Sequence, residues 1–72
     1  MNKIYVVTFL VGSNENIFGI FESLESAVSQ VERWFYTNNI SATKHVIKDL
    51  IVYQGYDGGD TVELIIEGVY PR

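Results

Sequence analysis

Asp57-Gly58-Gly59-Asp60 is the stretch whose residue types come closest to a ligand-binding loop. A calcium loop needs alternating oxygen ligands and a distal glutamate, and a phosphate loop needs a glycine pattern that runs into a helix. Neither follows here, because residues 61–70 alternate in polarity as a strand does. Asp-Gly and Gly-Gly supply the positive φ angles that hairpin turns require. The stretch therefore predicts a turn between two strands.

Glu63 and Glu67 are the next candidates for chemistry, since alternation puts them on the same face of the strand 61–70. Their separation would be about 13 Å, which is too far for two carboxylates acting on one bond. His45 has no cysteine or serine context that indicates a nucleophile relay, and the chain has no cysteine for a thiolate metal site. We therefore expect no catalytic residue, no metal and no cofactor, and the protein is predicted not to be an enzyme.

Composition narrows the class of protein further. The 72 residues are expected to form a single domain, 1–72, and a hydrophobic fraction of 47% argues against disorder. The net charge of −4 and the scattered basic residues argue against direct nucleic-acid binding. No apolar run approaches the roughly 20 residues that span a bilayer. The lack of cysteine agrees with a reducing compartment, so a cytoplasmic location is expected.

The elements that would hold these residues follow from periodicity. Residues 3–11 read as a strand that is apolar on both faces, and residues 17–22 as a second strand that forms a hairpin with it. Ser23 is a good helix N-cap, and the Asn38-Asn39 pair is a good helix end. Apolar residues recur between them at helical spacing, at Leu24, Ala27, Val28, Val31, Trp34 and Phe35.

The stretch 40–49 is ambiguous between helix, loop and strand, and we favour one strand over about 46–56. With a last strand over 61–70, the order becomes ββαββ. The prediction is an α+β two-layer sandwich: a four-stranded antiparallel sheet of order 2-1-3-4 with the helix on one face. The first strand is the most apolar, so we expect it to be central.

One helix can cover only one face of such a sheet, yet the strands are apolar on both. By alternation, some large side chains must point away from the helix, among Tyr5, Val7, Phe9, Ile51, Tyr53 and Ile65. Exposed apolar patches of several hundred Å² usually mark an interaction surface. The sequence therefore predicts a partner on the open sheet face, either another protein or a second copy in a homodimer.

Seven residues are predicted to contact a protein partner: Tyr36, Tyr53, Tyr56, Ile65, Glu63, Glu67 and Tyr70. Tyrosine is favoured at interfaces, although these tyrosines also read as surface aromatics or cross-strand packing pairs. The glutamates read either as solvating groups or, with the other acidic residues, as a surface for a basic partner.

The first half of the chain resembles short uncharacterised proteins of bacteria and their phages. In these, a strand of the form K-x-Y-V is followed by G-x-F-x-S-x-E-x-A and a helix. The matching residues are Lys3, Tyr5, Val6, Gly19, Phe21, Ser23, Glu25 and Ala27. The resemblance carries over no activity.

A phage or mobile-element accessory protein that inhibits a host defence or regulatory factor is the role that we expect from this resemblance together with the open face. The alternative is a small-ligand-binding module, with a pocket between sheet and helix or at a dimer interface.

Overall fold

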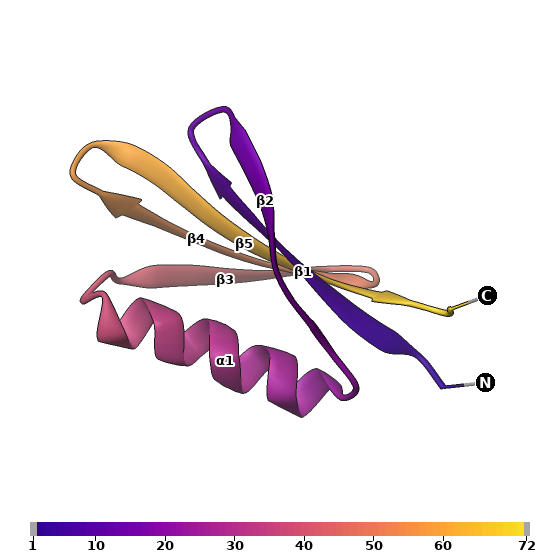
Figure 1. Ribbon diagram of the computed structural model, residues 1–72. Helices are drawn as coiled ribbons and strands as arrows, with labels where there is room; N and C mark the ends of the chain where they lie inside the picture. The colour runs from indigo at the N-terminus through magenta and orange to yellow at the C-terminus, as the bar shows by residue number, and fades with distance from the viewer. Residues whose placement is uncertain (1, 72) are drawn as a thin grey trace.

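The computed structural model describes residues 2–71, which form five strands and one helix (Figure 1). Their bounds in chain order are β1 Ile4–Val11, β2 Asn14–Phe21, α1 Leu24–Thr37, β3 Ala42–Ile47, β4 Leu50–Asp57 and β5 Asp60–Val69. The two-layer α+β arrangement with a helix on one face is present, but the prediction of a four-stranded ββαββ sheet was wrong.

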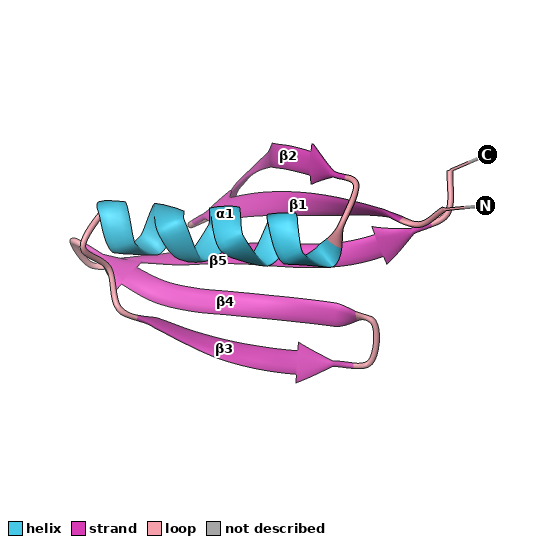
Figure 2. Ribbon diagram, turned by 90° about the horizontal axis from the view of Figure 1, so that it is seen from below, coloured by secondary structure: helices cyan, strands magenta, loops and turns pink. Residues whose placement is uncertain are grey.

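The strands form one antiparallel sheet of order β2-β1-β5-β4-β3. The expected order 2-1-3-4 is therefore corrected, and β5, not β1, is the central strand. β2 and β3 are the two edges, and α1 connects them by running along one face of the sheet (Figure 2). The last strand in the chain joins two hairpins, β1–β2 and β3–β4, into one layer.

The fifth strand comes from the stretch that the sequence left ambiguous. Ile47 pairs with Leu50, so Lys48 and Asp49 form a two-residue turn that divides the expected strand 46–56 into β3 and β4. Lys48 has a φ of 52°, a conformation in which glycine or asparagine is far more common. Because lysine is not typical of such turn positions, the sequence did not predict this turn.

Helix α1 begins and ends as its sequence predicts. The Ser23 side chain accepts a hydrogen bond from the backbone N–H of Ser26 at 3.1 Å, which confirms the N-cap. At the other end, the backbone N–H of Asn38 donates to the carbonyl of Trp34, and Asn39 takes a left-handed φ of 57°. The helix is therefore held at both ends by local contacts, independently of the sheet.

The core lies between α1 and the sheet face that it covers, which we call the covered face. Its buried side chains come from the helix and from β1, β4 and β5: Val7, Ala27, Val31, Phe35, Tyr53, Val62, Leu64 and Ile66. Aromatic rings extend this core, since Trp34 meets both Phe9 and Phe35 edge-on at about 5 Å between ring centroids. Helix and sheet are thus joined by apolar contact along most of α1.

The Asp57–Asp60 stretch is the hairpin turn that the sequence predicts. Asp57 pairs with Asp60, and Gly58 and Gly59 have φ angles of 60° and 95° between them. Both glycines are needed at these angles, because side chains with a Cβ are disfavoured there. The two aspartates flank the turn and are exposed.

Candidate binding face

The sheet face opposite α1 is the candidate site, and we call it the open face. Residues alternate between the two faces along each strand, so the neighbours in sequence of the core residues point away from the helix. Its apolar side chains are Ile4, Val6, Leu10, Ile17, Ile20, Ile47, Leu50, Val52, Ile65 and Val69, and none of them is buried. The side of the sheet that α1 leaves uncovered is therefore partly apolar in the described residues, with polar side chains such as Thr8, Thr43 and Gln54 among the apolar ones.

Two rows of side chains cross the open face from edge to edge. The strand register puts Ile17, Thr8, Ile65, Val52 and His45 in one row, from β2 through β1, β5 and β4 to β3. The second row is Ile20, Val6, Glu67, Leu50 and Ile47. The two rows are adjacent, so their apolar members form a patch that has Thr8 and Glu67 within it and His45 at its β3 end.

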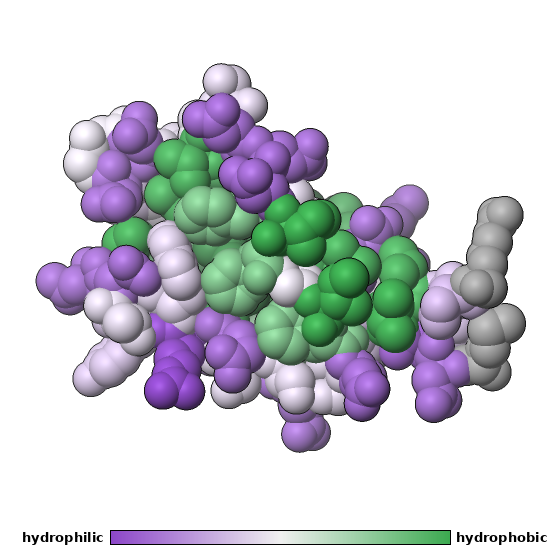
Figure 3. All heavy atoms as spheres, viewed as in Figure 1, coloured by the Kyte–Doolittle hydropathy of each residue, from purple (hydrophilic) through white to green (hydrophobic). Residues whose placement is uncertain are grey.

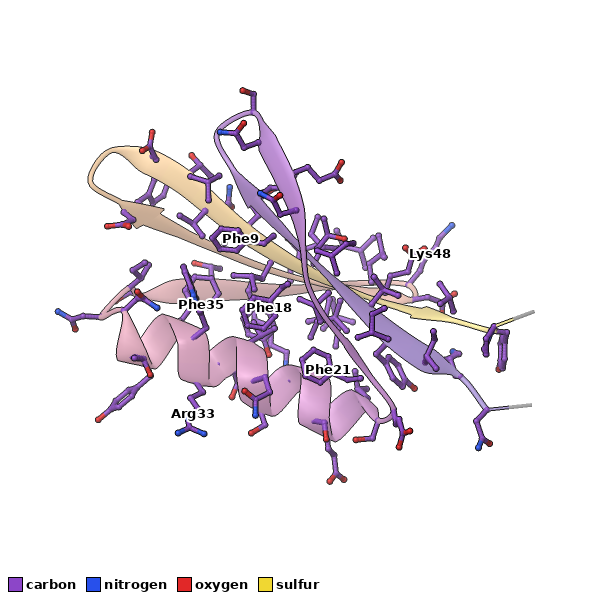
Figure 4. All side chains as sticks on the ribbon, viewed as in Figure 1. Phe9, Phe18, Phe21, Arg33, Phe35 and Lys48 are labelled. Carbon is purple, nitrogen blue, oxygen red and sulfur yellow. The ribbon has the colours of Figure 1, made fainter. Side chains whose placement is uncertain are left out.

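The edges of the open face are its most exposed part. Ile17 and Ile20 on β2 are 63% and 64% exposed, and Ile47 on β3 is 55% exposed. Figure 3 shows hydrophobic surface spreading across the middle of the side on which β2 lies in front. The β2 edge adds aromatic area, since Phe18 and Phe21 lie between β2 and α1 and pack against the core (Figure 4).

A β-bulge in β2 brings the two exposed isoleucines to the same face. Val7 pairs with Gly19 while Thr8 pairs with Ile17, so Phe18 is an extra residue without a partner on β1. In a regular strand, residues 17 and 20 would point to opposite faces. The bulge instead turns Phe18 toward the helix and leaves Ile17 and Ile20 together on the open face.

The two faces of the sheet differ in charge, because the covered side has lysines as well as acidic groups such as Glu32, while the open face has glutamates. Glu15, Glu63 and Glu67 lie on the open face, by the same register that places their neighbours Leu10, Ile65 and Val6. Lysines lie on the other side: Lys44 Nζ is 5.7 Å from the ring centroid of Tyr53 on the covered face.

The other lysines of residues 2–71 and Arg33 are also outside the open face, whereas His45 lies on it at the β3 edge. Lys3 lies against Gly68 on the helix side of the sheet. Arg33 points from α1 away from the sheet, and Lys48 is at the β3–β4 turn (Figure 4). Within residues 2–71, the open face therefore has no lysine or arginine.

The seven predicted contact residues fall into separate regions. Ile65, Glu63 and Glu67 lie together at the centre of the open face, and Tyr56 lies at its end, 70% exposed and paired with Thr61. Tyr36 is 87% exposed on α1, away from the sheet. Tyr70 follows β5 beside Lys3, whose Nζ is 5.4 Å from its ring centroid. The structure therefore brings four of the seven together.

Tyr53 is placed apart from these four, on the covered face. Its side chain is only 3% exposed, and its hydroxyl donates a hydrogen bond to Glu32 on α1 at 2.7 Å. Burial raises the pKa of this hydroxyl well above its ordinary value, and the hydrogen bond and charge of Glu32 act in the same direction. Tyr53 therefore connects the helix to the sheet.

The sequence left six large residues without an assigned face. Only Ile65 of these lies on the open face, and the other five lie on the covered face: Tyr5, Val7, Phe9, Ile51 and Tyr53.

Sequence reasoning missed several residues of the open face, namely Glu15, Ile17, Ile20, Leu50 and Val52. The strong alternation of β5 is the signal that fixes which parity is buried there, and strand pairing then carries that parity to β1 and β4. Without the order of the strands, that pairing was not available.

Open hollows lie where the helix meets the sheet, and one of about 790 Å³ lies beside the start of α1, lined by Lys3, Ile4, Tyr5 and residues 22–24 among others. Two others are smaller. One of about 220 Å³ lies beyond the start of α1 and is lined by Lys3, Tyr5, Lys48 and apolar residues of the sheet. A second of about 330 Å³ lies near the end of α1, beside Glu32, Tyr36 and Lys44. Pockets for drug-sized ligands are usually about 300–1,000 Å³ and mostly enclosed. Across residues 2–71, no group of three or more His, Cys, Asp or Glu side chains is arranged to hold a metal ion.

Comparison of the chain with protein-family models, with curated proteins and with solved structures found no match. The resemblance to phage proteins therefore stays a prediction. Within the described residues, no helix is long and apolar enough to cross a membrane.

Proposed function

We propose that this protein is a non-enzymatic binding module whose open face binds a partner protein. The observation that carries the proposal is the apolar patch around Ile65, on a sheet whose other face is already occupied by α1. Large exposed apolar patches on small soluble proteins usually mark interaction sites.

The size of the patch supports a protein partner rather than a small molecule. Complete burial of one isoleucine side chain contributes about 1.5–3 kcal/mol, while association costs about 4–15 kcal/mol in lost freedom. Ile17, Ile20 and Ile47 are each more than half exposed and lie at opposite edges of the sheet. Only a ligand that spans the whole sheet covers all three at once, together with the half-buried apolar side chains between them.

A second copy of the chain is the other candidate occupant, as a homodimer with open face against open face. Its support is the small size of the domain, since pairing two such faces adds a core that one chain lacks. Sedimentation at several concentrations distinguishes the two: a dimer that Ile65→Lys converts to a monomer supports self-association, and a monomer at every concentration supports a separate partner.

The narrower role is part of the proposal. In it, the module acts in the cytoplasm of a bacterial host as a phage or mobile-element accessory protein, and the partner is a host defence or regulatory factor that it inhibits. The support is the resemblance of the N-terminal half, together with a surface suited to binding.

Site-specific photocrosslinking in cells that express the protein tests the binding proposal. A benzophenone side chain at Thr8 sits beside Ile65 on the open face, and the same group at the exposed Gln30 sits on the outer side of α1. We expect discrete protein adducts from position 8 that Ile65→Lys removes, and none from position 30. Equal adducts from both positions, or none from position 8, would contradict the proposal.

A further inference from the structure

We infer that the partner presents to the open face an amphipathic helix with lysine or arginine residues bordering its apolar stripe. The inference rests on the proposed function and names the class of partner for that same face. Its basis is the difference in charge between the faces, since Glu15, Glu63 and Glu67 lie among the apolar side chains while the lysines and Arg33 of residues 2–71 lie elsewhere.

The two central glutamates set the spacing of the partner's charges. Glu63 and Glu67 are on β5, the middle strand, with Ile65 between them on the same face. At the strand rise, their Cα atoms are about 13 Å apart. Residues seven or eight apart on a helix are about 11–12 Å apart and point the same way. Two basic residues two turns apart therefore reach both carboxylates while the residues between them lie over Ile65.

A helix is the element that fits, because the same sheet already accepts one. α1 lies along the covered face and contacts it with a single apolar stripe that includes Ala27, Val31 and Phe35. The open face has the same central strand and the same two neighbours, β1 and β4. A partner helix of similar length would complete a three-layer arrangement with helices on both faces.

Charge also decides against other occupants. Two open faces placed together would bring two sets of three glutamates into one apolar interface, where like charges are destabilising. An anionic lipid surface meets the same repulsion. An uncharged partner would remove water from these carboxylates and offer no charge in return, which is unfavourable. A cationic helix instead pairs them with positive charges.

Three designed 18-residue helical peptides with one common apolar stripe test this inference. They differ only at two positions, seven residues apart and bordering the stripe, which are both Lys, both Gln or both Glu. Binding to the full chain is measured by isothermal titration calorimetry, and amide chemical shifts locate the site. We expect the Lys peptide to bind about tenfold more tightly than the Gln peptide, and the Glu peptide to bind least tightly. Raising the salt concentration should weaken the Lys peptide most.

Two double variants with the same change in net charge provide the matched comparison. E63Q/E67Q is expected to bring the Lys-to-Gln affinity ratio close to one. E22Q/E25Q, which removes two carboxylates near the start of α1, is expected to keep it near ten. Urea unfolding of both variants confirms that they fold.

The outcomes separate this inference from the proposed function. Equal affinity for the three peptides, all lost in Ile65→Lys, would overturn the cationic partner but leave the open face as a binding surface. Binding of none of the peptides would overturn the inference, and crosslinking from position 8 would then decide whether the face binds a protein at all. A Lys preference that survives E63Q/E67Q, or shifts mapping to α1, would also overturn it.

Discussion

The two faces of the sheet are formed by the same strands but differ in burial and in charge. On the covered face, Val7, Leu64 and Ile66 are fully buried under α1. On the open face, their sequence neighbours Val6, Ile65 and Glu67 stay in contact with solvent. The covered face has lysines at its margins, and the open face has glutamates at its centre. The difference indicates that one side of this sheet contributes most of the stability, while the other stays accessible to solvent and, in our proposal, to a partner.

The adjacent pair Leu64 and Ile65 gives the strongest test of this comparison. Leu64→Ala should lower the free energy of unfolding by about 2–5 kcal/mol, because it leaves a cavity in the core. Ile65→Ala should cost well under half of that, because its side chain is already partly solvated. Urea denaturation of the two variants measures both values. Equal losses would mean that the open face is as important to folding as the covered one.

Tyr53 and Tyr56 make the same comparison for tyrosines on opposite faces of β4. Tyr53→Phe removes the hydrogen bond to Glu32 and should cost about 1–2 kcal/mol, while Tyr56→Phe should leave stability unchanged. Denaturation at neutral pH provides the measurement. An equal effect of both substitutions would show that the Tyr53–Glu32 contact contributes nothing.

Because of the Tyr53 contact, the stability of the protein should also depend on pH in the alkaline range. The folded state holds the pKa of Tyr53 above the unfolded value near 10, so its contribution is complete below about pH 10 and is lost as the pH rises above that value. The stability gap between the wild type and Tyr53→Phe should therefore be constant from pH 7 to 9.5 and shrink at higher pH. A gap that widens above pH 10 would contradict this assignment.

A variant at the N-cap of α1 tests how much the stability of this helix depends on local contacts. Ser23→Ala should cost about 1 kcal/mol, since it removes the acceptor for the Ser26 amide. Ser29→Ala, at an exposed position on the same helix, should be neutral or slightly stabilising because alanine favours helix. Thermal unfolding compares the two, and similar melting temperatures would argue against the cap.

The smallest effect on stability is expected at the β2 edge. Ile17→Thr combined with Ile20→Thr should change the free energy of unfolding by less than about 1 kcal/mol, because both side chains are largely exposed. The same change should clearly reduce the fluorescence of a hydrophobic dye such as ANS bound to the native protein. Undiminished dye binding would place the accessible apolar surface elsewhere.

Local signals in the sequence were enough for several elements. The β1–β2 hairpin, the Ser23 cap and the Asp57–Asp60 turn each depend on a few neighbouring residues, and the structure confirms all three. The shared face of Glu63, Ile65 and Glu67 follows from alternation alone. The uncovered apolar side followed from counting layers, which needs no knowledge of strand order.

What escaped prediction depends on contacts between distant parts of the chain. The Lys48-Asp49 turn has no glycine or asparagine, so the division of 46–56 into two strands left no local mark. The insertion of β5 between β1 and β4 is set by pairing across most of the chain. The grouping of Ile17 with Ile20 depends on the bulge at Phe18, which contradicts simple alternation.

The central position of β5 has a consequence for how the protein is made. Residues 4–57 are synthesised first, but they contain only two hairpins and a helix that cannot yet share a sheet. Isolated hairpins are marginal in water, so the nascent chain stays open until residue 69 leaves the ribosome. Folding then requires closure between segments about 60 residues apart, which is slow compared with local pairing. A premature stop near the start of β5 would therefore remove the strand that joins the two hairpins and is expected to prevent folding.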